Sequence, residues 1–110
     1  MKPQMKLGKH CVPCEGEIPP IKGGEAKKWM YMVPGWKLEQ TKKIARMFTF
    51  KGFMQALKFV NQVGKIAEAE GHHPDIEVHW NKVTLTLWTH AIGGLSTNDF
   101  ILARKINTLV

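Results

Sequence analysis

The sequence predicts an α+β domain: a four-stranded antiparallel sheet with three helices packed on one face, in the order α-β-β-α-β-β-α. Three short segments alternate apolar and polar residues, and a fourth, residues 44–50, is rich in β-branched and aromatic residues; both patterns are typical of strands. Three other segments repeat apolar residues at helical spacing, and the middle one is the longest. At 110 residues, of which 44% are hydrophobic, the chain has enough material for one domain and its core.

The first half of the chain is expected to hold one short helix and two strands. Residues 25–33 place apolar side chains at helical spacing, and Pro34-Gly35 closes this segment. Strands are predicted at residues 36–40 and 44–50, joined by a turn at 41–43. These two strands form the first strand pair.

A long helix is predicted from residue 52 to residue 70. Gly71 is suited to end this helix in a left-handed conformation. Gly64 lies inside it, where glycine costs about 1 kcal/mol relative to alanine, and a close packing partner would explain its presence. The apolar stripe of the helix consists of Phe53, Leu57, Val60, Val63 and Ala67.

The second strand pair leads to a geometric expectation about two histidines. A two-residue turn at Asn81-Lys82 would set residue 80 opposite residue 83 and bury one face of the hairpin. Continued to the open end, this register sets His73 opposite His90, with Cβ atoms about 4.5–5.5 Å apart. A bulge near Pro74 would exchange His72 for His73 in this position.

The last helix is expected from about residue 97 to residue 107. Ser96 and Asp99 have the spacing of a capping box, in which both side chains bind backbone N–H groups of the first turn. Asp99 is therefore interpreted first as a helix-capping carboxylate in the first turn of a helix.

Three histidines gather near the predicted helix end and hairpin, and three interpretations compete. In the first interpretation the histidines are surface polar groups, and in the second His72, His73 and His90 form a zinc site. In the third, two imidazoles act as general acid and base, which suits them because the unperturbed pKa of imidazole is about 6.5. Adjacent residues of extended chain point to opposite faces, which argues against His72 and His73 binding one ion. Glu68 lies four residues before His72 and could share the last helical turn with it. The acid–base interpretation is favoured.

Composition limits the cellular setting and the partners. The formal charge is +7, but the chain has only two arginines and no recognisable nucleic-acid motif, so nucleic acid is not expected as a partner. No apolar run approaches the roughly 20 residues of a membrane helix, and the start lacks the apolar core of a signal peptide. A cytoplasmic location is expected. Residues 1–18 are expected to form an irregular tail, in which Cys11 and Cys14 are interpreted as reduced thiols, and residues 19–110 are expected to form the domain.

Several spacings at once resemble the signature of the pterin-4a-carbinolamine dehydratases, over roughly residues 19–108. The matching residues are Glu68-x3-His72-His73-Pro74, Trp80, Trp88-Thr89-His90 and Gly94-Leu95-Ser96-x2-Asp99, together with Pro34-Gly35-Trp36 and Phe50-Lys51-Gly52-Phe53. The predicted fold is also that of this family.

The resemblance implies a lyase that dehydrates 4a-hydroxytetrahydropterin to quinonoid dihydropterin, and so recycles the pterin of an aromatic amino acid hydroxylase. It implies no metal and no redox cofactor, and a homodimer or homotetramer. By position, His72 and His90 would be the acid–base pair, and His73 would hold the pterin. Glu68 would orient an imidazole. Further substrate contacts are expected from Trp36, Trp88 and Asp99. The alternative is a pterin-binding or protein-bridging module without turnover, like the transcriptional dimerisation cofactor of this family.

Overall fold

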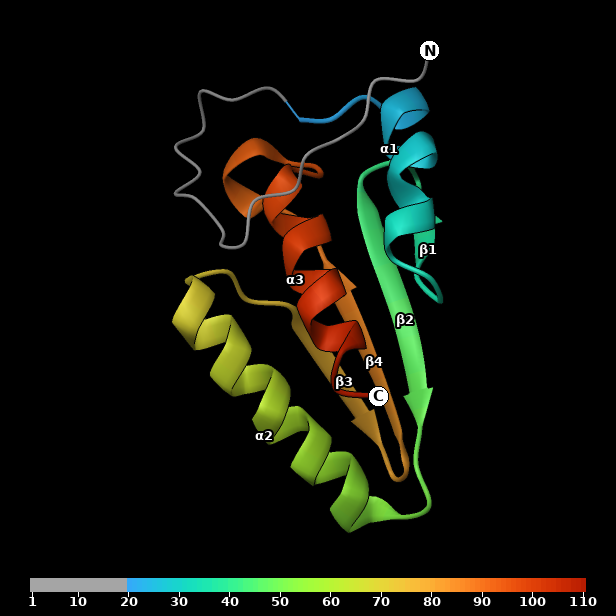
Figure 1. The fold of residues 1–110 in the computed structure, drawn as a ribbon, viewed down its shortest axis with the longest axis vertical. Coiled ribbons are helices and arrows are strands. Elements are labelled where there is room, and N and C mark those ends of the chain that lie inside the picture. Colours follow the sequence, from blue (N-terminus) through green and yellow to red (C-terminus); the bar gives the residue numbers. More distant parts are fainter. Residues whose placement is uncertain (1–19) are drawn as a thin grey trace.

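The computed structural model describes residues 20–110 and confirms the predicted fold class (Figure 1). The predicted tail and its two cysteines lie outside the described residues. No helix within the described range is both long and apolar enough to cross a membrane. The elements are α1 (Gly23–Trp29), a 3-10 helix (Met30–Met32), β1 (Lys37–Glu39), β2 (Lys43–Thr49), α2 (Phe53–Glu70), β3 (Asp75–His79), β4 (Lys82–Leu87), a second 3-10 helix (His90–Ile92) and α3 (Thr97–Asn107).

The four strands form one antiparallel sheet in the order β1-β2-β4-β3, and the helices cover one of its faces (Figure 1). The alternation seen in the sequence fixes which side chains face the helices, since successive residues of a strand point to opposite faces. The buried core between the sheet and the helices contains Ile44, Phe48, Val83, Leu85 and Leu87 from the sheet and Phe59, Val63, Phe100, Leu102 and Ile106 from the helices.

The hairpin register differs from the prediction by two residues. Val78 pairs with Val83, so the two-residue turn is Trp80-Asn81 instead of Asn81-Lys82. Trp80 adopts a left-handed conformation with φ of 52° and is 68% exposed. The turn is held from outside the hairpin, because Asn81 and Phe50 exchange hydrogen bonds of 2.8 and 2.9 Å. A shift of two residues keeps every side chain on its face, so the hydrophobic pattern fits both registers.

This register changes which histidine meets the end of β4. The prediction that His73 lies opposite His90 is wrong. Continued beyond the paired strands, the observed register sets His72 opposite Thr89. The structure thus brings His72 toward the residue that precedes His90.

Two glycines, Gly64 and Gly71, differ in whether the backbone conformation at their position favours glycine. Gly71 follows α2 with φ of 66°, as predicted, whereas Gly64 lies in the middle of the helix. A Cβ atom at Gly64 would meet no described atom within 4 Å, so the expected packing partner is not found among residues 20–110.

We therefore expect Gly64→Ala to raise the free energy of unfolding by about 1 kcal/mol, because alanine is the better helix former. Gly71→Ala is expected to lower it by about 1–2 kcal/mol, because a Cβ atom strains the left-handed conformation. Urea denaturation of both variants beside the parent protein measures the two shifts. A lower midpoint for Gly64→Ala, or an unchanged one for Gly71→Ala, would contradict this account.

Candidate active site

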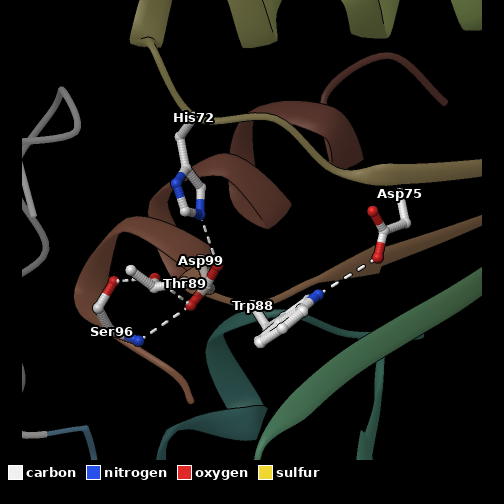
Figure 2. Close-up of polar contacts among 6 residues, drawn as sticks. All are labelled: His72, Asp75, Trp88, Thr89, Ser96 and Asp99. Atoms are coloured by element: carbon white, nitrogen blue, oxygen red, sulfur yellow. Dashed lines mark hydrogen bonds and ion pairs between the residues drawn. The ribbon is translucent and has the colours of Figure 1, made fainter. Parts of the chain in front are cut away.

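His72 forms a hydrogen-bonded pair with a buried carboxylate. Gly71 turns the chain away from α2, and this directs His72 toward the start of α3. There His72 Nε2 lies 2.6 Å from Asp99 Oδ1 (Figure 2). The His72 side chain is 12% exposed and that of Asp99 is fully buried. A contact between a ring nitrogen and a carboxylate at this depth holds the imidazole in one orientation.

The second carboxylate oxygen of Asp99 binds the start of α3 and the end of β4. Oδ2 accepts hydrogen bonds from the Ser96 backbone N–H and from Thr89 Oγ1, each at 2.9 Å (Figure 2). The Thr89 and Ser96 hydroxyl groups lie 2.6 Å apart. The capping box predicted from Ser96 and Asp99 is confirmed. The same carboxylate therefore caps a helix and holds a histidine.

Asp99 also determines which nitrogen of His72 carries the proton. A carboxylate can only accept hydrogen bonds, and its Oδ2 already accepts two. His72 Nε2 must then be the donor in the 2.6 Å contact, which leaves Nδ1 as the nitrogen that can accept a proton. A carboxylate that fixes the tautomer of an imidazole and stabilises its protonated form is a recurring arrangement in acid–base catalysis.

Glu68 binds His73 and not His72. His73 Nε2 lies 2.6 Å from Glu68 Oε1, and both side chains are largely exposed. The expectation that Glu68 and His72 share the last helical turn is wrong, because α2 ends at Glu70 and Gly71 reverses the chain. The chain folds His73 back over the end of the helix, and His72 faces the other way, toward α3.

His90 begins the second 3-10 helix directly after β4. An isolated bridge between Thr89 and Gly94 closes this loop at its base. The His90 ring stacks on the Trp88 ring, with centroids 3.9 Å apart and an angle of 26° between the planes. Trp88 Nε1 donates a hydrogen bond of 3.2 Å to Asp75 Oδ2 (Figure 2).

Thr89 links these two groups of side chains. Its hydroxyl belongs to the His72–Asp99 network, while its chain neighbours Trp88 and His90 form the aromatic stack. The three histidines named from the sequence therefore come to the same end of the sheet. Each has a different neighbour, which is Asp99, Glu68 or Trp88.

Trp36 lies elsewhere, although it was expected at the substrate. It is 5% exposed and packs edge-on against Phe48. Its Nε1 and Arg46 Nη1 both donate hydrogen bonds to Asn107 Oδ1, at 2.8 and 2.7 Å. Asn107 ends α3, eight residues after Asp99, which is about 12 Å along a helix axis. The structure places Trp36 in the core at the far end of α3, and not beside the histidines.

The zinc interpretation finds no matching geometry in the described part of the chain. Among residues 20–110, no group of three or more His, Cys, Asp or Glu side chains is arranged to hold a metal ion. His72 and His73 point to different partners, as the alternation of extended backbone implies.

Comparisons with known proteins agree with these observations. The model of the pterin 4 alpha carbinolamine dehydratase family matches residues 19–109. A protein of Chlorobaculum tepidum, provisionally named a pterin-4-alpha-carbinolamine dehydratase, is 50% identical over 105 residues, which cover 93% of this chain and 95% of that one. A protein of Rubrobacter xylanophilus with the same provisional name is 44% identical over 101 residues, covering 92% and 94% of the two chains.

A solved structure gives the same result at the level of the fold. The crystal structure of a transcriptional coactivator/pterin dehydratase from Brucella melitensis superposes with a TM-score of 0.77 and 32% sequence identity, over 82% of this chain and 97% of that one. The residues that resembled the family signature, from Glu68 to Asp99, all lie within the matched range. The chain belongs to the pterin-4-alpha-carbinolamine dehydratase family.

Proposed function

We propose that this protein removes water from 4a-hydroxytetrahydropterin to give quinonoid dihydropterin, and thereby recycles the pterin of an aromatic amino acid hydroxylase. The observation that carries the proposal is the buried His72–Asp99 pair at the same end of the sheet as His90, in a chain of the dehydratase family. The pair supplies an imidazole with a fixed tautomer, which is what a general base requires.

Within the pterin, the reaction breaks the N5–H and C4a–O bonds and forms one π bond, while one proton passes to the base and another passes from the acid to the leaving oxygen. The base takes the proton from N5, and the electron pair of the N–H bond forms the double bond between N5 and C4a. The C4a–O bond breaks as the acid donates a proton to the hydroxyl group, which leaves as water. No oxidation state of the pterin changes in this elimination, so acid–base groups of the chain suffice and no redox cofactor is needed.

His72 and His90 are assigned the two proton transfers. His72 Nδ1 accepts the N5 proton, and the carboxylate of Asp99 stabilises the imidazolium that results. His90, which is exposed, donates the proton to the leaving hydroxyl group. His73 and Glu68 present an exposed polar pair, suited to hydrogen bonds with the pterin heterocycle.

The test is the rate of water elimination from freshly generated 4a-hydroxytetrahydropterin, followed by absorbance. We expect the protein to accelerate this step above buffer, before and after treatment with a chelator and dialysis. A matched sample with an equal concentration of an unrelated basic protein controls for catalysis by lysine side chains. If the protein is no faster than buffer, the enzyme assignment fails, and pterin binding or protein bridging without turnover takes its place.

The proposal includes the setting that the family resemblance implied. That setting is a homodimer or homotetramer, and the cytoplasmic location expected from the sequence itself is part of the same proposal.

A further inference from the structure

We infer that Trp88 is a positioning residue: its indole holds the His90 ring in place, and Asp75 and Lys43 hold the indole. Trp88 was expected to contact the pterin, and in the structure one face of its ring stacks on His90. The effect on catalysis rests on the proposed dehydration, whereas the stack itself can be tested without any substrate.

The stack is the only described interaction that restrains the His90 side chain. Within residues 20–110, the structure shows no hydrogen bond or ion pair to the His90 imidazole, which is exposed to solvent. An exposed side chain with no partner samples several rotamers, and ordering it has an entropic cost. The nearly parallel contact at 3.9 Å with Trp88 covers one face of the imidazole and so favours one orientation.

The indole is itself held by two other strands. Asp75, the first residue of β3, accepts the hydrogen bond from Trp88 Nε1 at 3.2 Å. Lys43, the first residue of β2, places its Nζ 4.6 Å from the centroid of the Trp88 ring, as in a cation–π contact. Trp88 directly follows β4, which lies between β2 and β3, so one residue from each flanking strand holds the plane of the ring. Figure 2 shows the contact with Asp75. Contacts with the sheet thereby restrain the indole of Trp88, and the indole restrains His90, which begins the second 3-10 helix.

A pterin cannot use the indole face that His90 covers. Trp88 therefore acts through His90, and its loss should affect the chemical step more than binding of the substrate. Small displacements of a catalytic group cost much, since a shift of about 1 Å can lower the rate by about 10²-fold. If Trp88 instead bound the pterin directly, its replacement would mainly raise KM and leave kcat unchanged.

The kinetic test compares Trp88→Leu with Trp88→Phe in the full chain. We expect Trp88→Leu to lower kcat by about 10-fold to 10²-fold with little change in KM. Trp88→Phe keeps an aromatic face for His90 and should retain kcat within a few-fold. Trp80→Leu is the matched control, because Trp80 lies exposed at the opposite end of the hairpin. A raised KM with unchanged kcat in Trp88→Leu would overturn the inference and make Trp88 a wall for the pterin.

A second measurement detects the stack without substrate. In proton NMR, the indole ring current should shift the imidazole C–H resonances of His90 upfield relative to those of His79, which is 78% exposed. Trp88→Leu should abolish this shift, and Trp88→Phe should retain part of it. If the His90 resonances are the same in the parent protein and in Trp88→Leu, the stack is absent in solution and the inference fails. If the stack is present but the parent protein does not dehydrate the pterin, the proposed function fails and the positioning of His90 stands.

Discussion

Replacing His72 by glutamine is expected to lower kcat for pterin dehydration by about 10²–10⁴-fold, the range typical for loss of a general acid or base. Glutamine keeps polarity and approximate size but cannot take up a proton. The Asp99 carboxylate can still accept a hydrogen bond from the glutamine amide, so the buried pair is replaced without an unpaired charge. The loss should therefore come from the chemistry and not from unfolding.

The matched control is His79→Gln. His79 is an exposed histidine on β3 whose nearest carboxylate, Glu77, is 3.7 Å away, and no step of the reaction is assigned to it. We expect its activity to equal that of the parent protein. Activity of His72→Gln within a few-fold of the parent would show that His72 transfers no proton.

His90→Gln tests the second half of the pair with the same assay. We expect His90→Gln to lower kcat by a similar factor. The double variant, which also carries His72→Gln, should lower kcat by far less than the product of the two single-variant factors. Residues that act as one catalytic unit are strongly non-additive, because removing either one already disables the concerted step. A double variant that loses the full product would mean that the two histidines act independently.

Replacing Asp99 is expected to separate stability from catalysis. Asp99→Ala leaves His72 Nε2 and the Ser96 N–H without their acceptor, and leaves Thr89 Oγ1 with the Ser96 hydroxyl as its partner. Each buried donor without a partner costs about 1–3 kcal/mol. We expect a loss of about 3 kcal/mol or more in the free energy of unfolding, which is a large share of a typical 5–15 kcal/mol. Urea denaturation measures this loss.

Asp99→Asn should keep most of the stability and still lose activity. The amide oxygen can accept from the Ser96 N–H, as asparagine does in helix caps. The amide NH₂ then faces His72 Nε2, which must accept the hydrogen bond, so the ring proton moves to Nδ1. His72 would present the wrong tautomer to the substrate, and we expect kcat to fall by about 10²-fold or more.

Glu77→Gln is the control for this substitution. It removes the same charge from an exposed position on β3 and should change neither stability nor activity appreciably. If Asp99→Asn retains full activity, the tautomer of His72 does not matter and Asp99 serves only to cap α3. If Asp99→Ala unfolds at the same urea concentration as the parent protein, the buried network does not contribute as described.

The sequence by itself determined the kinds and order of the elements. A period of two residues marks the strands and a period of 3.6 marks the helices, and both are local properties that one stretch of chain carries alone. The end of α2 at Gly71 and the capping box of Ser96 and Asp99 were predictable for the same reason, since a single residue or a four-residue spacing specifies them. The three histidines and Glu68 were named from the sequence pattern itself, and the family resemblance added their individual roles and the further substrate contacts.

Only the tertiary structure decided which of these residues meet. The hairpin register could shift by two without exposing a core residue, and the hydrogen bonds that Asn81 forms with Phe50 in the observed register join segments that are distant in the sequence. The partner of His72 proved to be Asp99, 27 positions away, and not the nearby Glu68. The sequence pattern does not tell whether Trp36 or Trp88 is buried. In the structure Trp36 packs in the core, whereas Trp88 stacks on His90. The physical reason is that a local pattern specifies the face on which a side chain lies, whereas its partner depends on how distant segments pack together.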